Sequence, residues 1–119
     1  MTKHSVGMLG QEAAKQFLAA KGFKILKENY RLRSSEIDII AKDGEYIVFV
    51  EVKFRKGLSH GLPRESVGRT KQRKIIKAAM HYILATQEAE QDYRFDVVEI
   101  LEKDGKLYAN HITNAFDVS

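Results

Sequence analysis

The sequence predicts an α/β fold: a single domain over residues 1–119, in which helices flank a mixed central sheet in the order α-β-β-β-α-β-β. Three observations predict it. Two stretches repeat their apolar residues at helical spacing, and five shorter apolar stretches have the composition of strands. No linker or internal repeat divides the chain, and 119 residues is close to the common size of one domain.

The first element is an amphipathic helix near residues 6–21, which ends at Gly22 because glycine commonly terminates helices. Gln11 lies at the border of its apolar stripe, beside Leu18, whereas Glu12 points away. The residues predicted to form the buried stripe are Leu9, Gly10, Ala13, Ala14 and Phe17.

Strands follow the first helix. One strand is expected near residues 23–31, and a hairpin then runs from Glu36 to about Phe54, with Asp43-Gly44 as its turn signal. Residues 56–66 hold two of the eight glycines and the only proline, so we expect a mobile loop there.

A second helix is expected over residues 67–87, followed by a strand near 93–102 and, after a turn at Asp104-Gly105, a return strand from Leu107 to Ile112. The buried stripe of this helix is predicted to be Ile75, Ile76, Ala79, Met80 and Ile83. Its opposite side is predicted to carry Lys71, Lys74, Lys77 and His81.

Charged residues interrupt the most apolar strand of the chain. From Ile47 to Phe54 every residue is apolar except Glu51 and Lys53. A strand of this composition is normally buried on both faces, and burying charges is costly unless they pair or bind a metal. The hairpin is therefore the first candidate for a functional site.

The period of two along a strand places these charges relative to one another. An even-numbered hairpin loop puts Asp38 opposite Phe49 and Glu36 opposite Glu51, on the face that carries Lys53. A three-residue loop would instead put Asp38 on the other face. With an even loop, Asp38 and Glu51 could hold one metal ion between them.

These residue types suit the hydrolysis of a phosphodiester. Carboxylates are hard ligands, and Mg²⁺ or Mn²⁺ is commonly held by one or two of them together with waters and substrate phosphate. Such a metal polarises the phosphoryl group and lowers the pKa of a bound water. Lys53 could stabilise the charge that develops on the phosphate oxygens, or position the attacking water.

Several short motifs follow one another along nearly the whole chain. They are Gly7 and Gly10, Phe17-Leu18, Gly22-Phe23, Ile25-Leu26, Asn29-Tyr30-Arg31, Glu36 to Ala41, Val48 to Arg55, Lys71 and Lys74, and Arg94 to Val98. Taken in order, they resemble the YraN-like family of small predicted bacterial endonucleases. The hairpin also resembles the PD-(D/E)xK nucleases, which have the restriction-endonuclease-like fold, and its spacing is similar to that of archaeal Holliday-junction resolvases.

The resemblance implies a restriction-endonuclease-like fold and a metal-dependent endonuclease acting on DNA, including branched or single-stranded DNA. It gives catalytic roles to Asp38, Glu51 and Lys53, and a metal held by Asp38, Glu51 and the backbone carbonyl of Val52. The related resolvases are dimers, so the resemblance also allows a homodimer.

Two departures from the family bear on the site. Gln11 stands where the family usually has Glu, and an amide oxygen carries no charge, so metal affinity would be weaker. Ser34-Ser35 replaces a common Gly, which affects the loop but no proposed ligand. Gln11 and Glu36 are therefore accessory candidates, and Glu36 is either a third ligand or a solvent-facing residue at a strand end.

The net charge of +4 is unevenly spread: Lys53 to Lys77 holds nine of the 20 Lys and Arg residues and one acid, Glu65. A basic surface beside carboxylates suits a nucleic acid, most simply DNA, although a solvated basic face is the alternative. The residues expected to contact the nucleic acid are Arg55, Lys56, Arg69, Lys71, Lys74 and Lys77.

Composition excludes several other classes of site. The chain has no cysteine, so it can form neither disulfides nor thiolate metal sites. No apolar run approaches the ~20 residues that span a bilayer, and we expect a cytoplasmic protein with no membrane partner. The four histidines have no metal-ligand spacing and are expected at the surface, and Asp96 is expected to be structural, paired with a basic residue.

Three functional classes follow. The first is the metal-dependent nuclease, which retention of Asp38, Glu51 and Lys53 favours, because a pure binder gains nothing from buried carboxylates. The second is a nucleic-acid-binding protein of the same fold with weak or lost catalysis, which Gln11 makes plausible. The third is a scaffold that only keeps the fold.

Overall fold

A computed structural model describes residues 3–56, 67–87 and 90–117, with the side chains of residues 3–8 left aside. Within these residues the elements are α1 (Lys3–Ala20), β1 (Lys24–Arg31), β2 (Glu36–Asp43), β3 (Tyr46–Lys56), α2 (Arg69–Thr86), β4 (Asp92–Lys103) and β5 (Lys106–Phe116). The predicted order α-β-β-β-α-β-β is confirmed. The predicted loop lies outside the described residues apart from Lys56, which belongs to β3.

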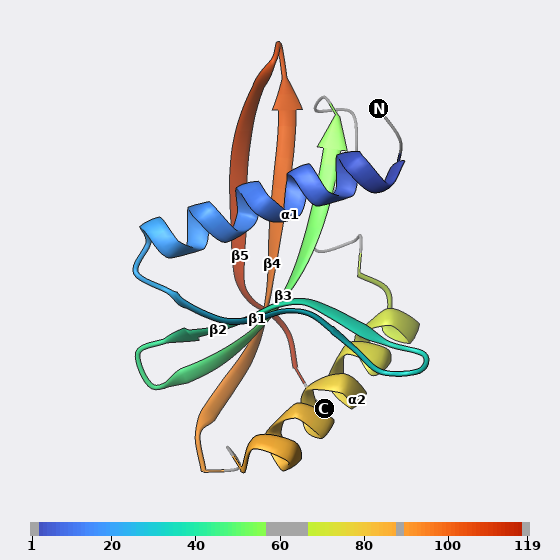
Figure 1. Ribbon diagram of the computed structural model, residues 1–119, viewed down its shortest axis with the longest axis vertical. Helices are drawn as coiled ribbons and strands as arrows, with labels where there is room; N and C mark the ends of the chain where they lie inside the picture. The colour runs from blue at the N-terminus through green and yellow to red at the C-terminus, as the bar shows by residue number, and fades with distance from the viewer. Residues whose placement is uncertain (1–2, 57–66, 88–89, 118–119) are drawn as a thin grey trace.

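The described strands form one mixed sheet in the order β1-β2-β3-β4-β5. β3 and β4 are parallel, and the other neighbouring pairs are antiparallel. The sheet is strongly twisted, so that β1 and β2 cross the direction of β4 and β5 (Figure 1). The mixed α/β architecture predicted from the sequence is therefore confirmed.

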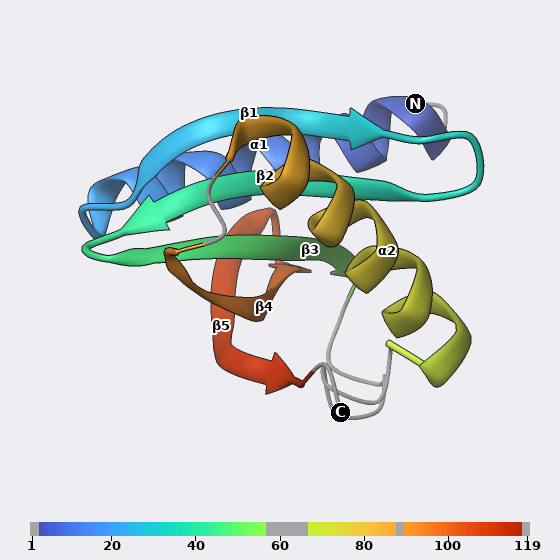
Figure 2. The same ribbon diagram turned by 90° about the horizontal axis from the view of Figure 1, so that it is seen from below.

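The two helices cover opposite faces of the sheet (Figures 1 and 2). α1 packs on a cluster that includes Ile39, Val48 and Val98, and α2 packs on a second cluster that includes Phe49 and Val97. Because β3 contributes to both clusters, it is buried on both faces from Ile47 to Val50, as its composition predicts.

The buried stripe of α1 differs from the prediction. Gly10, Ala14 and Leu18 are buried at i, i+4 and i+8, whereas Leu9 is 45% exposed. The close approach of α1 to the sheet explains this narrow ridge: a Cβ atom at Gly10 would lie 2.9 Å from Cδ2 of Phe54. The smallest residue therefore faces β3, and larger neighbours lie to either side.

The stripe of α2 is also rotated relative to the prediction. Ile75, Ala79 and Ile83 are buried as expected, but Met80 is 43% exposed, and Ala78 and Tyr82 take its place in the core. The Tyr82 ring packs edge-on against Phe49, with the ring centroids 6.0 Å apart. An aromatic ring and a small alanine therefore fill the space that the pattern assigned to Met80.

The central hairpin has an even loop, Gly44-Glu45, with Asp43 paired to Tyr46. The predicted pairing of Asp38 with Phe49 is wrong by two residues, because Phe49 pairs with Ile40 instead. Glu36 likewise does not pair with Glu51: its ladder partner is Arg31 of β1, and the β2–β3 ladder ends at Ile39 and Val50. A shift of two leaves the faces unchanged.

A buried acid, Asp96, lies on β4 next to β5. Asp96 is 0% exposed and accepts hydrogen bonds from Nε of Arg94 (3.0 Å), Nε2 of His111 (2.7 Å) and the backbone N–H of Asn114 (2.9 Å). Arg94 also bonds Asp43 at 2.9 Å. We call these five residues the Asp96 cluster. The structural role expected for Asp96 is confirmed.

His111 is not the surface residue that the sequence suggested. Its ring is held edge-on against Phe17 and Phe23 from the α1 side, and its Nδ1 lies 2.8 Å from Nζ of Lys21. Because Lys21 can only donate, the Nδ1 atom accepts and Nε2 carries the proton given to Asp96. The cluster thus ties the end of α1 to β4 and β5 on the face of the sheet that α1 covers.

Candidate active site

Asp38 lies where β2 separates from β3. Its Oδ2 accepts a hydrogen bond of 2.8 Å from the backbone N–H of Val52, in place of a further rung of the ladder. Burial, followed by repulsion from Glu51, raises the pKa of Asp38 to about 7, although the bond from Val52 and the nearby Lys71 oppose the rise. Asp38 forms no ion pair within the described part of the chain.

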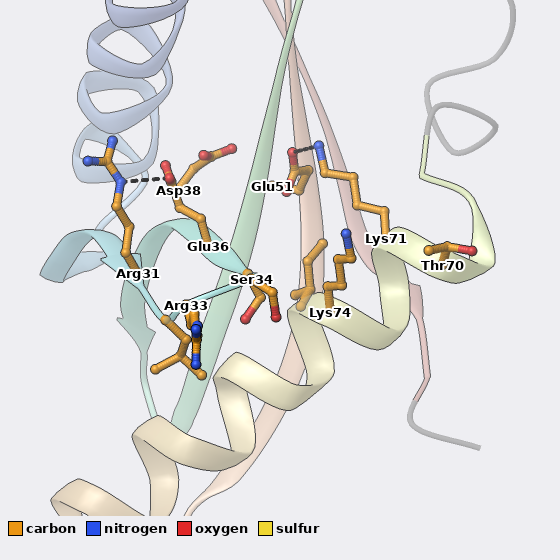
Figure 3. Close-up of a pocket in the computed structure, with 12 residues that line it drawn as sticks. Arg31, Arg33, Ser34, Glu36, Asp38, Glu51, Thr70, Lys71 and Lys74 are labelled. Carbon is orange, nitrogen blue, oxygen red and sulfur yellow. Dashed lines mark hydrogen bonds and ion pairs between the residues drawn. The ribbon is translucent and has the colours of Figure 1, made fainter.

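Glu51 lies on β3 and is only 5% exposed. Its Oε1 is 2.7 Å from Nζ of Lys71 and 3.7 Å from Nζ of Lys53. Figure 3 shows Lys71 reaching from α2 across to Glu51. Asp38 and Glu51 therefore lie together in the structure, as the hairpin predicted, and two ammonium groups lie beside Glu51. Lys53 was predicted at this site, whereas Lys71 was predicted to contact the nucleic acid.

The two lysines affect each other. Burial and a hydrogen bond with Lys71 lower the pKa of Lys53, and attraction to Glu51 only partly offsets this. Burial would also lower the pKa of Lys71, but its bonds to Glu51 and Lys53 outweigh that effect and raise it. Of the two, Lys53 is therefore the one whose proton is held less firmly.

The carboxylates line a cleft with two lobes that share Arg31, Glu36, Asp38, Glu51 and Lys71. The larger lobe has a volume of about 670 Å³, and we call it the basic lobe because Arg33 and Lys74 also line it. The smaller, of about 300 Å³, is the polar lobe. Its remaining lining residues are Gln11, Asn29, Val52, Lys53 and Phe54.

The accessory candidates both reach the cleft. Gln11 lines the polar lobe, as its place on the helix predicts, and Glu12 is exposed. Glu36 lines both lobes, but its Oε2 is paired with Nε of Arg31 at 2.7 Å, so a role as third ligand would require that pair to open. For Val52, the structure shows its N–H bonded to Asp38, and its carbonyl as a metal ligand stays a prediction.

The predicted nucleic-acid contacts divide into three groups. Arg55 pairs with the buried Glu99 at 3.4 Å, so its guanidinium is already engaged within the fold. Lys71 belongs to the carboxylate site, and Lys74 lines the basic lobe. The exposed residues Lys56, Arg69 and Lys77 lie outside the lining of both lobes.

Arg31 and Arg33 are cations of the cleft that charge counting missed. They lie before the basic stretch of the sequence, and only the Asn29-Tyr30-Arg31 motif gave a signal for one of them. The hydroxyl oxygen of Ser35, which lines the same lobe, is buried without a hydrogen-bond partner in the described residues. The basic lobe thus draws its cations from both the β1–β2 turn and α2.

The donors of the cleft fit a small hard cation. Mg²⁺ needs only one or two carboxylates, because waters and substrate phosphate complete its coordination. The Lys71 ammonium on Glu51 shows that this oxygen already attracts a cation. In the described residues no group of three or more His, Cys, Asp or Glu side chains could hold a metal, so the protein would supply few ligands.

Comparison with known proteins gives a consistent result. The family model of the "Uncharacterised protein family UPF0102" matches residues 10–100. A UPF0102 protein of Carboxydothermus hydrogenoformans is 40% identical over 117 residues, covering 98% of this chain and 99% of the relative. One from Chlorobium limicola is 51% identical over 98 residues, covering 82% and 76%.

A UPF0102 protein of Caldanaerobacter subterraneus is 43% identical over 119 residues and covers 98% of each chain. The names of these relatives assign no activity. Among the helices that the structure describes, none is both long and apolar enough to cross a membrane.

Proposed function

The chain belongs to the UPF0102 family, also called the YraN family, and from that premise and the chemistry of its cleft we propose that it is a divalent-metal-dependent nuclease. It hydrolyses phosphodiester bonds in DNA. The observation that carries the proposal is a carboxylate pair, the half-buried Asp38 and the buried Glu51, in a cleft where Glu51 also has two lysines, Lys53 and Lys71, beside it. Asp38 accepts one backbone hydrogen bond, has a raised pKa and forms no ion pair with any residue that the structure describes.

Asp38 and Glu51 would hold Mg²⁺ or Mn²⁺, with Gln11 close enough in the polar lobe to add an amide oxygen. When bound, the metal polarises the phosphoryl group and makes a bound water more acidic. Lys53 then donates to the phosphate oxygens, where negative charge grows as the water oxygen bonds to phosphorus. The ester oxygen leaves and takes a proton, giving one phosphate and one hydroxyl end.

A polyanionic substrate accounts for the basic lobe. Lys74 and Arg33 line the same lobe as the carboxylates and form no ion pair with them in the described residues, so the phosphates that flank the scissile bond are suitable partners for them. Such contacts fix the position of the strand and carry no sequence information. The affinity they provide falls with salt, as for other phosphate contacts.

The test is cleavage of single-stranded, branched and duplex DNA by the purified protein, with Mg²⁺, with Mn²⁺ and with chelator. We expect cleavage with either metal and none with chelator. Asp38→Ala, Glu51→Gln and Lys53→Ala should each abolish it, and Lys53→Ala should keep most of the DNA affinity. Glu45→Gln is the matched control, because Glu45 is an exposed acid at the other end of the same hairpin.

One observation favours the second candidate, a nucleic-acid-binding protein with weak or lost catalysis. Because Glu36 is paired with Arg31, the polar lobe offers a metal two carboxylates, Asp38 and Glu51, together with Gln11, where the family usually has an acid. If the wild type binds DNA but cleaves none of the substrates, Gln11→Glu decides between the candidates. Metal-dependent cleavage by that variant alone would mean that catalysis has been lost at this position. If neither the wild type nor Gln11→Glu cleaves DNA in the presence of metal, the nuclease proposal is rejected.

A further inference from the structure

Lys71 contacts the site from an unexpected direction. It lies in the first turn of α2, and its ammonium is 2.7 Å from Oε1 of Glu51, whereas Lys53, two residues from Glu51 on the same strand, is 3.7 Å away. One carboxylate oxygen therefore faces two ammonium groups. Asp38, the other carboxylate of the cleft, has none in ion-pair contact within the described residues. Positive charge is thus unevenly distributed between the two acids.

A purely structural role for Lys71 explains little of this. α2 is already held on the sheet by buried residues such as Ile75, Ala79 and Ile83. The side chain of Lys71 is 46% exposed, and the buried Glu51 also has the ammonium of Lys53 at 3.7 Å, so neutralising Glu51 within the fold does not depend on Lys71 alone. Two ammonium groups placed close together also repel each other. The arrangement is better suited to a cation that can leave Glu51.

Lys71 also lies where the substrate would pass. It is one of the residues shared by the basic lobe and the polar lobe, so a strand that crosses the carboxylates passes its ammonium. A cation bound to Glu51 cannot share Oε1 with an ammonium 2.7 Å away, because both seek the same lone pairs and repel each other. Lys71 has a flexible four-carbon stem that allows its head group to move.

We propose that Lys71 is a second catalytic lysine: it neutralises Glu51 in the metal-free protein, yields that carboxylate to the divalent cation, and then contacts the phosphate of the substrate. This inference rests on the proposed nuclease function. It gives the two lysines different roles. Lys53 stays beside Glu51 on the same strand, whereas Lys71 exchanges Glu51 for the phosphate of the substrate.

The first test measures metal binding without DNA. Lys71→Met removes the competing charge but keeps an unbranched side chain, so Mn²⁺ should bind more tightly by about tenfold, the scale at which groups next to metal ligands alter affinity. Lys74→Met is the matched control: it lies one turn further along α2, lines the same lobe and has no ion pair with Glu51. Its calorimetric Mn²⁺ affinity should equal that of wild type.

The second test follows the ammonium itself in the wild type and needs no substitution. In ¹⁵N-labelled protein, the Nζ resonance of Lys71 should shift when Mg²⁺ is added, because the 2.7 Å contact to Glu51 is released. Adding a DNA strand in chelator-free buffer with Ca²⁺, which takes the same kind of oxygen ligands as Mg²⁺, should shift it again. The Nζ resonance of Lys74 should respond to the DNA only.

The third test separates catalysis from binding. Lys71→Met should lower kcat by at least about 100-fold, in the range of lost transition-state electrostatic contacts. It should weaken DNA binding no more than Lys74→Met does. Lys71→Arg keeps the charge and should recover part of the rate, as well as the wild-type Mn²⁺ affinity.

The outcomes separate this inference from the proposed function. If the wild type binds Mn²⁺ and cleaves DNA, but Lys71→Met leaves both metal affinity and kcat unchanged, Lys71 is only a structural partner of Glu51 and the inference fails. An unmoved Lys71 resonance at saturating Mg²⁺ overturns it as well. If the wild type neither binds Mn²⁺ nor cleaves DNA, it is the nuclease proposal itself that fails.

Discussion

Two acids of the sheet, the buried Asp96 and the half-buried Asp38, are treated in opposite ways. Burial alone would raise the pKa of Asp96, but hydrogen bonds from His111, Arg94 and Asn114 outweigh it and lower the pKa. Asp38 receives one backbone hydrogen bond, faces Glu51, and has a pKa raised to about 7. The first carboxylate is satisfied by the protein alone, and the second is not.

This difference indicates which acid serves the fold. In the Asp96 cluster every hydrogen-bond donor to the carboxylate comes from the β4–β5 pair: the side chains of Arg94 and His111 and the backbone N–H of Asn114. Removing such a carboxylate leaves the buried hydrogen-bond donors around it without an acceptor, which is costly. At Asp38 the fold supplies no ion pair among the described residues, which is expected where a ligand from solution, such as a metal ion, binds the carboxylate. Opposite responses to neutralisation should therefore distinguish the two regions.

The largest effect is expected at the Asp96 cluster. Asp96→Asn leaves Arg94 and His111 without their carboxylate, and breaking a buried pair of this kind costs about 3–5 kcal/mol of unfolding free energy. Urea denaturation of the variant and of Asp92→Asn, an exposed acid at the start of the same strand, provides the measurement. If Asp96→Asn lowers the unfolding free energy by less than about 1 kcal/mol, the Asp96 cluster contributes less to stability than its burial suggests.

The next largest effect concerns added metal. A ligand that binds only the native state adds about 2.7 kcal/mol at a concentration 100 times its dissociation constant. Mg²⁺ should therefore raise the melting temperature of the wild type and of Glu45→Gln, but have little effect on Asp38→Asn. Equal shifts in all three proteins would place the metal somewhere other than the cleft.

A smaller effect, of opposite sign to that at Asp96, is expected when Asp38 is neutralised without metal. The folded protein keeps the proton on Asp38 up to about pH 7, whereas the unfolded chain releases it near 3.8. Because the folded state binds more protons in that window, stability from this group falls as the pH rises from about 4 to about 7.

Asp38→Asn removes that loss, so at pH 8 in chelator it should be the more stable protein. Relief of about 1 kcal/mol would raise the melting temperature by roughly 4 °C in a domain of this size. For Asp96 the sign is reversed: its lowered pKa gives stability that is present above the unfolded value and lost at lower pH. If Asp38→Asn melts below wild type at pH 8, Asp38 has a counter-charge after all.

The smallest effect is expected at the rim of the cleft. Lys74→Ala should lower the slope of log K against log salt by about 0.9 for duplex DNA, because one phosphate contact is lost. Lys103→Ala, an exposed lysine at the β4–β5 turn, should leave the slope unchanged. Equal slopes for Lys74→Ala and wild type would mean that α2 does not face the nucleic acid.

Strand periodicity alone predicted much of the site. Asp38, Glu51 and Lys53 lie at one cleft because any even loop keeps the faces of a hairpin, so the two-residue error in register was harmless. Lys71 could be placed on α2 but not at Glu51, since helical periodicity fixes neither the rotation of a helix against a sheet nor its distance from it. The same limitation led to the misplacement of Met80.

The Asp96 cluster was harder to predict. The sequence indicated a paired Asp96, but His111 looked like an isolated histidine on a short return strand. Its burial depends on Phe17 and Phe23, which are distant in sequence, and on β5 continuing to Phe116. Contacts of this kind arise from the three-dimensional arrangement and leave no local pattern along the chain.

The close contact between Gly10 and Phe54 has a consequence for how this site could change over generations. It holds α1 against β3, and so keeps the neighbouring position 11 within the polar lobe whatever residue stands there. Codons for Gln and Glu differ at a single base, so one point mutation would add a carboxylate to the three that already line the cleft, Glu36, Asp38 and Glu51, without any rearrangement of the helix. A side chain at Gly10 would push α1 away and close that route.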